Sequence, residues 1–349
     1  MISVYKNVNK DNCNKLKVSI IIPCRNEEKY IGKCLDSLIY NDYPKNMIEI
    51  FVIDGMSEDN TRGIIERYIK KYPYIKLINN SKRIVPTALN IGIKEARGDI
   101  IIRIDSHNTY PSNYIEKLVL WIRKSKADNI GGIWITKPGA ETVIARAISL
   151  VLSHPFGVGN GLFRIGIKEP KYVDTVPFGA YKREVFNKIG LFNEKLIRNQ
   201  DLEFNLRLKK VGGKILLVPD IVSYYYARST LRALAKNNFS NGFWVIYSTK
   251  FAKIPFSVRH LIPFFFVLSI CGSLILSFIY RFFIYMFVLV FVTYLISNIL
   301  FSLKTSFKKG FKYFIPLMLS FATLHFSYGF GSIVGLIKLL WEWVRKVIL

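Results

Sequence analysis

Val18-Ser-Ile-Ile-Ile-Pro23 is a run of apolar, mostly β-branched residues that stops at a proline. A short apolar run of this kind predicts a strand that is buried on both faces, as in a parallel sheet. Three further strands of the same kind are expected over residues 48–53, 75–78 and 100–104. The segments between them have the apolar spacing of helices, over 27–40, 61–71 and 87–96. Because strand and helix alternate, we predict an α/β fold with an open, mostly parallel sheet and helices on both faces.

The pattern is less regular beyond residue 105. Three more helices are expected, over 114–124, ahead of Gly190 and over 201–210. Strands are expected around Gly131 and over 215–218. Residues 155–161 form a glycine-rich loop, but no helix with a Lys-Ser/Thr pair follows, so a phosphate cradle is not indicated. This loop is expected to contact the acceptor or the membrane instead.

Polar side chains follow several of the predicted strands. Asn26, Asp54 and Asp105 all come just after a strand end, which is where ligands bind in open α/β sheets. Asp105 and His107 stand two residues apart and could hold one face of a divalent cation. About a hundred residues later, Asp201 offers a carboxylate that could act as a base. Together these residues suggest transfer of a group from a metal-bound diphosphate to an acceptor hydroxyl.

The C-terminal part of the chain is strongly apolar. Of all 349 residues 51% are hydrophobic and only 21% are charged. Three long stretches lack Asp, Glu, Lys and Arg, over 261–280, 282–303 and 313–337. Each is long enough to cross a hydrocarbon core of ~30 Å at ~1.5 Å per residue. We therefore expect a membrane domain over 257–349 with about three spans.

The formal charge of +26, from 50 Lys and Arg against 24 Asp and Glu, fits several partners. Nucleic acid is one, but the basic residues flank the apolar stretches, and only Asp220 and Glu342 are acidic after Glu203. That distribution favours anionic membrane lipid and an acidic substrate, and no nucleic acid is expected. Residues 229–256 mix basic and aromatic side chains, which predicts an interfacial amphipathic segment.

Cysteine usage and the N-terminus bear on the compartment. The four cysteines form no CxxC pair, and the N-terminus has no apolar signal region, so residues 1–228 are expected to form a cytoplasmic domain of a multi-pass cell-membrane protein. The positive-inside rule places Lys304–Lys312 in the cytoplasm. A third span would then put Lys338 and Arg345 outside, which the rule disfavours. Either one segment is re-entrant or interfacial, or the tail is an exception.

Five motifs in order resemble the family 2 glycosyltransferases with the GT-A fold, over about residues 18–228. They begin at Val18, Val52, Ala96, Arg103 and Asn199. Asp105-Ser-His107 with Tyr110-Pro111, Pro155-Phe-Gly-Val-Gly159 and residues 173–180 look like the succinoglycan-type membrane-anchored glucosyltransferases.

The resemblance implies a role for each matched residue. Asp201 would be the catalytic base, Asp105 and His107 would hold Mn²⁺ or Mg²⁺, and Asp54 would bind the uracil or ribose of a UDP-sugar. Arg228 would bind the diphosphate, with lipid headgroups as its other possible partner. The expected donor-binding residues are Pro23, Arg25, Asn26, Glu27, Asp54, Arg83, Asp105, Ser106 and Arg228.

The sequence also departs from the family pattern. His107 stands where a second aspartate is more frequent, and imidazole suits Mn²⁺ better than Mg²⁺. Gln200 stands where many relatives have glutamate, and the Gln-x-x-Arg-Trp motif of processive synthases is absent. We therefore expect an inverting transferase that moves a sugar from a nucleotide sugar, UDP-linked by expectation, to a lipid-linked saccharide. The alternatives are a non-catalytic nucleotide-sugar-binding subunit of an export complex and a polyprenyl-phosphate glycosyltransferase.

Overall fold

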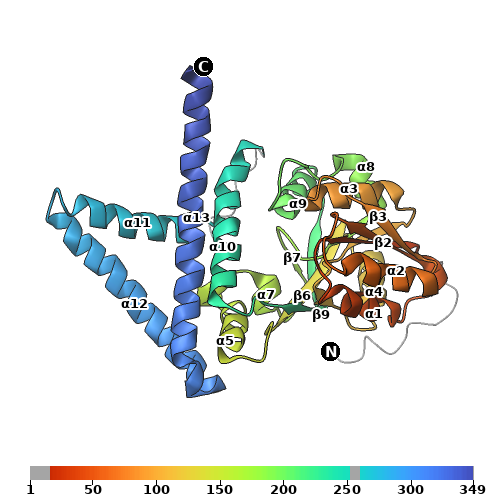
Figure 1. The fold of residues 1–349 in the computed structure, drawn as a ribbon, viewed down its shortest axis with the longest axis horizontal. Coiled ribbons are helices and arrows are strands. Elements are labelled where there is room, and N and C mark those ends of the chain that lie inside the picture. Colours follow the sequence, from red (N-terminus) through yellow and green to blue (C-terminus); the bar gives the residue numbers. More distant parts are fainter. Residues whose placement is uncertain (1–15, 252–259, 349) are drawn as a thin grey trace.

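The computed structural model describes residues 16–251 and 260–348, and its sheet is built outward from β1 (Val18–Cys24). β1 lies parallel to both β2 (Ile48–Asp54) and β4 (Ile100–Arg103), and β3 (Ile75–Asn79) lies parallel to β2. These strands match the predicted ones to within one or two residues. Their carboxyl ends meet at one edge of the domain, drawn in red and orange in Figure 1.

The other half of the sheet is mixed, so the predicted mostly parallel sheet is wrong there. β8 (Ala180–Lys182) runs antiparallel to β4 and to β6 (Asn129–Lys137), whereas β9 (Ile215–Tyr226) runs parallel to β6. β5 (Asn108–Thr109) and β7 (Lys171–Tyr172) pair with β9 in the antiparallel direction. β5, β7 and β8 have two or three residues each, too few for a repeating pattern to appear in the sequence.

β9 is eight residues longer than predicted. The predicted strand ended at Val218, and Pro219, which cannot donate to a strand ladder, follows it. The structure absorbs the interruption with a shift of the β6–β9 register between Gly132 and Ile133. Past this irregularity β9 continues to Tyr226. Tyr225 near its end packs against the ring of His107.

Helices cover both faces of the sheet, as predicted. One face packs its buried side chains, such as Ile20 and Val52, under α1 (Ile31–Ile39) and α4 (Tyr114–Lys124). The opposite face, with Ile21 and Phe51, packs under α3 (Val85–Glu95) and α9 (Gln200–Lys210). α2 (Thr61–Lys71) and α8 (Arg183–Ile189) complete the layers. The predicted loop 155–161 contains a single helical turn, α6 (Pro155–Val158), and α7 (Leu162–Ile165) follows it.

Four long helices follow the domain. α10 (Leu231–Tyr247) and α13 (Phe314–Ile348) lie side by side, while α11 (Ile262–Leu276) and α12 (Phe282–Lys309) form a hairpin that leads away from the domain (Figure 1). Small residues bring α10 and α13 together, because a β-carbon on Gly242 would lie only 1.9 Å from the Tyr328 carbonyl oxygen. The predicted interfacial segment is thus largely a helix docked on α13, and its residues 252–256 lie outside the described residues.

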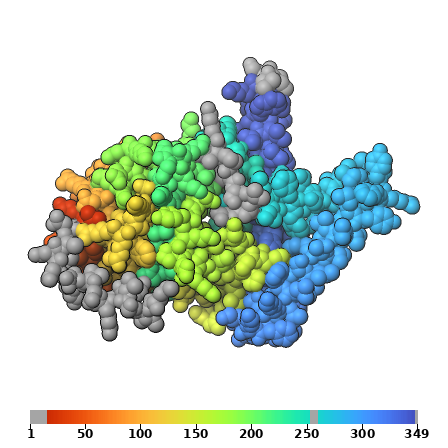
Figure 2. Space-filling model, turned by 180° about the vertical axis from the view of Figure 1, so that it is seen from behind, coloured from red at the N-terminus to blue at the C-terminus, as the bar shows by residue number. Residues whose placement is uncertain are grey.

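Two of the three expected spans have the length and composition needed to cross a membrane. These are the segments Phe282–Lys309 and Phe311–Lys346. In the most apolar 18-residue stretch of α12, only 6% is buried against the rest of the protein. The first expected span, 261–280, is interrupted because α11 ends at Leu276. Figure 2 shows the α11–α12 hairpin projecting from the body of the molecule. Large apolar side chains on this hairpin, such as Phe282 and Leu289, are exposed.

Candidate active site

The carboxyl ends of β1, β2 and β4 surround a cavity of about 240 Å³. It collects most of the residues that the sequence assigns to a nucleotide-sugar donor. The predicted site residues in its wall are Pro23, Arg25, Glu27, Arg83, Asp105, Ser106 and His107. Asn26, Asp54, Asp201 and Arg228 do not line this cavity, and their places are described below.

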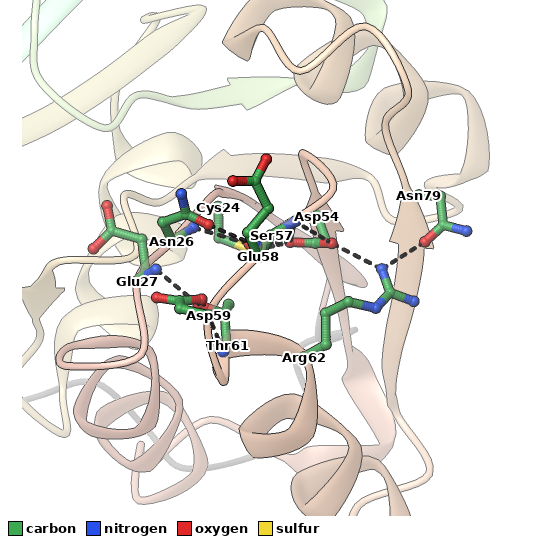
Figure 3. Close-up of polar contacts among 10 residues, drawn as sticks. All are labelled: Cys24, Asn26, Glu27, Asp54, Ser57, Glu58, Asp59, Thr61, Arg62 and Asn79. Carbon is green, nitrogen blue, oxygen red and sulfur yellow. Dashed lines mark hydrogen bonds and ion pairs between the residues drawn. The ribbon is translucent and has the colours of Figure 1, made fainter.

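The loops after β1 and β2 are tied together beside the cavity, as Figure 3 shows. The Asn26 backbone N–H donates to Ser57 Oγ at 2.9 Å, and Asn26 Oδ1 accepts from the Glu58 N–H at 2.8 Å. The Glu27 N–H donates to Thr61 Oγ1 at 2.7 Å. These bonds hold residues 25–30 outside the helix, so α1 begins at Ile31 and not at Glu27 as predicted. Asn26 therefore shapes the donor cavity through its neighbours.

Asp54 is fully buried beneath the loop that follows it. Its carboxylate accepts from Arg62 Nη1 at 2.8 Å and from Ser57 Oγ at 2.5 Å. Arg62 also donates to Asn79 Oδ1, which links the ends of β2 and β3 (Figure 3). Direct binding of uracil or ribose by Asp54 stays a prediction, and the visible role of Asp54 is to order the 54–61 loop. The sequence interpretation gave Arg62 no role, although it is a basic residue in the first turn of a helix, where the dipole favours acidic residues.

Arg103 brings the two most important predicted carboxylates together. Arg103 Nη2 lies 2.9 Å from Asp105 Oδ1, and Arg103 Nη1 donates to Asp201 Oδ2. Arg103 sits at the end of β4 and Asp201 in the first turn of α9, 98 residues later. The second Asp201 oxygen, Oδ1, is buried and has no hydrogen-bond partner in the structure. The sequence interpretation included Arg103 in a motif but assigned it no function.

The surroundings of Asp201 suit a proton acceptor. Burial raises the pKa of the Asp201 carboxyl, Arg103 opposes this effect, and the nearby Asp105 adds to it, so that the net pKa shift is upward. A base with a raised pKa holds a transferred proton more strongly than an ordinary aspartate. Because Oδ2 is held by Arg103, the carboxylate is also fixed in orientation.

His107 lines the same cavity as Asp105. Its Nδ1 is 3.4 Å from Glu27 Oε1, and its ring meets the edge of Tyr225 with centroids 6.1 Å apart. Burial lowers the pKa of the imidazole, but Glu27 and Asp105 outweigh burial and the net shift is upward. In the described part of the chain no three His, Cys, Asp or Glu side chains are grouped as a metal cage. Asp105 and His107 still fit a cation held jointly with a diphosphate, because Mg²⁺-type sites often take only one or two protein ligands plus substrate phosphates.

Arg228 lies between the catalytic domain and the long helices. The Arg228 charge lowers the pKa of both His107 and Arg198. Arg228 is therefore near His107 and near the segment that leads into α9. Arg228 lines a second cavity, of about 510 Å³, between the domain and helices α10–α13. The predicted contact between Arg228 and a donor diphosphate therefore stays a prediction, made at the junction of two cavities.

Comparisons with known proteins agree on one family. The sequence profile of glycosyl transferase family 2 matches residues 19–190. A dolichyl N-acetyl-alpha-D-glucosaminyl phosphate 3-beta-D-2,3-diacetamido-2,3-dideoxy-beta-D-glucuronosyltransferase from Methanococcus voltae is 35% identical over 75% of the chain and 84% of its own length. Succinoglycan biosynthesis protein ExoA from Rhizobium meliloti is 28% identical over 67% of the chain and 71% of its own length.

A solved structure resembles the whole arrangement. A mannosyltransferase from Pyrobaculum calidifontis, solved with GDP-Man and Mn²⁺, matches with a TM-score of 0.58 and covers 89% of the chain and 87% of its own. Its sequence identity is 14%, so the likeness concerns the fold alone. The fold likeness supports the predicted Rossmann-like GT-A architecture followed by apolar helices.

Proposed function

The chain belongs to glycosyl transferase family 2 and is a glycosyltransferase, and from this premise we propose that it moves a sugar from a nucleotide sugar to a hydroxyl of a lipid-linked saccharide, with inversion. A UDP-hexose is the donor we favour. The names of the relatives support the acceptor class, since one acts on a dolichyl-phosphate-linked sugar and another belongs to succinoglycan synthesis. The observation that carries the proposal is that Asp105 and Asp201 each contact one amino group of the same Arg103 guanidinium.

That placement orders the groups that the reaction needs. In this proposal the diphosphate of the donor lies near Asp105, which contacts Arg103 Nη2. The acceptor hydroxyl lies at Asp201, which contacts Arg103 Nη1. Asp201 Oδ1, which has no hydrogen-bond partner among the described residues, takes the proton of that hydroxyl as the hydroxyl oxygen attacks the anomeric carbon and the diphosphate departs. One base and one displacement invert the anomeric carbon, as in inverting glycosidases.

A divalent cation would be held by Asp105 and His107. When bound, such an ion neutralises charge that develops on the leaving diphosphate. Glu27, which contacts His107 in the structure, orients the imidazole through its carboxylate. The basic side chains of Arg25 and Arg83 line the same cavity and add positive charge for the nucleotide phosphates.

The two alternative functions predict different behaviour. A non-catalytic nucleotide-sugar-binding subunit needs no base, yet Asp201 is oriented by Arg103 and its pKa is raised. A transferase that uses polyprenyl phosphate as acceptor attacks with an oxygen that carries no proton, so Asp201 would be dispensable. The unpartnered Asp201 oxygen supports an acceptor with a hydroxyl.

Transfer of radiolabelled sugar into a lipid extract tests the proposed function. The full-length protein in detergent is incubated with a panel of UDP- and GDP-sugars and with a bacterial lipid extract. We expect label from one donor to enter the lipid fraction, to fall at least tenfold with EDTA and to return with Mn²⁺. Label that stays in the nucleotide sugar, although the donor binds, would contradict the proposal and favour the non-catalytic subunit.

We also propose a mode of membrane attachment in which α11 and α12 enter the bilayer as a hairpin and α13 stays on the side of the catalytic domain. The contacts at both ends of α13 support this. Near its start, Leu317 and Phe321 share a buried cluster with Leu234 of α10 and with α5 (Val143–Val151). Near its end, Glu342 lies 2.6 Å from Lys250 and accepts a hydrogen bond from Tyr247.

This arrangement explains the distribution of charge. A crossing by α13 would take α10 into the bilayer with it, because the end of α13 contacts Lys250 and Tyr247 at the end of α10. With α13 on the domain side, Lys304–Lys312 and the basic residues at 338, 345 and 346 all face the same compartment, as the positive-inside rule requires. This proposal keeps the multi-pass prediction, with two crossings in place of about three, and places the catalytic domain in the cytoplasm.

Reporter fusions at the C-terminus check the topology. In a bacterial host, green fluorescent protein fused after Leu349 is expected to fluoresce, and alkaline phosphatase at the same position is expected to be inactive. The same reporters fused after Tyr247 serve as the domain-side control. Active phosphatase after Leu349 would show that α13 crosses the membrane and would contradict the hairpin arrangement.

A further inference from the structure

The second cavity lies between the catalytic domain and the long helices, and it is unlike the donor cavity. Its volume is about 510 Å³, and its wall comes from the 152–164 segment, β9, α10, α11, α12 and α13. None of the described residues that line it is an aspartate or a glutamate. The cavity is therefore positive at its polar end and apolar elsewhere.

Arg164 is the most unusual residue in this wall. Its guanidinium lies 4.4 Å from the ring centroid of Trp134 and 5.1 Å from that of Tyr225. Among the described residues it forms no ion pair with a carboxylate, and its buried Nη1 has no hydrogen-bond partner. Arginine stays charged in proteins, and a buried charge that no opposite charge compensates is costly. Arg164 thus has the properties of a cation that is held ready for an anion.

Arg198 extends this positive end toward the catalytic base. Its guanidinium donates to Asn241 Oδ1 at 2.6 Å and to Asn237 Oδ1 at 3.2 Å, and both asparagines line the cavity. Arg198 precedes Asp201 by three residues, at the start of α9. Tyr225, which touches Arg164, also meets the edge of His107. An anion at Arg164 would therefore lie beside Tyr225, which separates it from His107.

The remaining wall is aromatic and aliphatic. Phe266 of α11 packs on Tyr294 of α12 with centroids 4.5 Å apart, and Leu324 of α13 closes the far side. His325 bridges this region, since its Nε2 lies 2.8 Å from the Phe156 carbonyl oxygen and its Nδ1 lies 3.1 Å from the Tyr294 hydroxyl. From this wall the apolar surface continues onto the exposed side chains of the α11–α12 hairpin.

We propose that this cavity binds the phosphate end of the acceptor's lipid carrier, with the phosphate on Arg164 and the first part of a single isoprenoid chain against Phe266, Tyr294 and Leu324. The inference rests on the proposed function and adds the place of the acceptor. The charge of the cavity matches a phosphate, the apolar wall leads into the proposed membrane hairpin, and the polar end adjoins Asp201. The saccharide that the lipid carries would reach from the phosphate to the base.

Binding of farnesyl phosphate to the full-length protein in nanodiscs of zwitterionic lipid tests the site without requiring turnover. The variant Arg164→Gln is expected to weaken this binding about 10- to 100-fold, since hydrogen bonds to charged groups are at stake. Arg146→Gln is the matched control, because Arg146 is half exposed, pairs with Glu141 and does not line the cavity. UDP-sugar binding is expected to be unchanged in both variants. Without ligand, Arg164→Gln is expected to unfold at a midpoint temperature no lower than that of the wild type, because the substitution removes a buried unpaired charge.

Three further comparisons show whether the bound phosphate belongs to the lipid carrier or to bilayer headgroups, and they separate a failure of this inference from a failure of the proposed function. Farnesol, which lacks the phosphate, should bind at least tenfold more weakly than farnesyl phosphate to the wild type. Added phosphatidylglycerol should not displace farnesyl phosphate, and equal displacement would assign the site to bilayer headgroups and overturn the inference. Equal farnesyl phosphate binding by wild type and Arg164→Gln would also overturn it. Wild-type sugar transfer would still support the proposed function in either of those cases, so the two failures are distinguishable.

Discussion

Asp201→Asn is expected to slow sugar transfer about 10²- to 10⁴-fold, the contribution of a positioned general base. Asparagine can still accept the hydrogen bond from Arg103 through its amide oxygen, so the fold of the site should survive. Affinity for the nucleotide sugar should change little, because Asp201 does not line the donor cavity. The measurement is the initial rate of label entering the lipid fraction, beside donor binding measured by calorimetry.

The matched control is Asp174→Asn. Asp174 pairs with Lys209 on the surface and is half exposed, so its loss should leave the rate within about twofold of the wild type. Full activity of Asp201→Asn would contradict the role of base and would favour an acceptor that needs no deprotonation.

Arg103→Met is expected to have the largest effect on stability among the site variants. Its guanidinium is only 12% exposed and is the shared partner of Asp105 and Asp201. Removing it leaves two like charges close together without a counter-charge. Breaking fully buried pairs of this kind costs about 3–5 kcal/mol, and the exposure of these carboxylates reduces our expectation to roughly 2–3 kcal/mol. Transfer should also fall at least as far as in Asp201→Asn, since the base loses its orientation.

A double-mutant cycle separates electrostatics from packing in this result. If charge repulsion is the cause, Arg103→Met with Asp201→Asn should unfold at a higher temperature than Arg103→Met alone. Arg146→Met supplies a surface control, where loss of an exposed ion pair is worth about 0–1 kcal/mol. A midpoint for Arg103→Met equal to that of the surface control would contradict the bridging role of Arg103.

The sequence predicted the parts of the site that lie in long, regular elements. β1, β2 and β4 are buried apolar runs, so their ends and the polar residues that follow them could be located from periodicity and breakers alone. Asp105 and Asp201 were assigned by resemblance, and the structure brings them together through Arg103. The family match and the relatives confirm the glycosyltransferase prediction, whereas the roles of the individual site residues stay predictions.

What the sequence missed depends on contacts between distant segments. The Arg103–Asp201 pair joins residues 98 positions apart, and no local pattern signals such a pair. The Arg62–Asp54 pair is closer in sequence but was also missed, and binding of the donor by Asp54 stays a prediction. The sequence analysis did not single out Arg164, because the segment before it has the pattern of an ordinary glycine-rich loop. Only the fold shows that its Nη1 is buried and that no carboxylate of the described residues pairs with it. The third expected span has the length and hydropathy needed for a crossing. Its placement on the domain side stays a proposal, because it rests on contacts of α13 with α5 and α10 that hydropathy does not show.

The anomeric configuration of the first product tests the central claim most directly. Wild-type protein is given the α-linked nucleotide sugar that it accepts, and the saccharide released from the lipid fraction is examined by NMR. A single displacement with Asp201 as base predicts a sugar attached in the β configuration. A sugar attached in the α configuration, or nucleotide consumption with no sugar in the lipid fraction, would contradict the account.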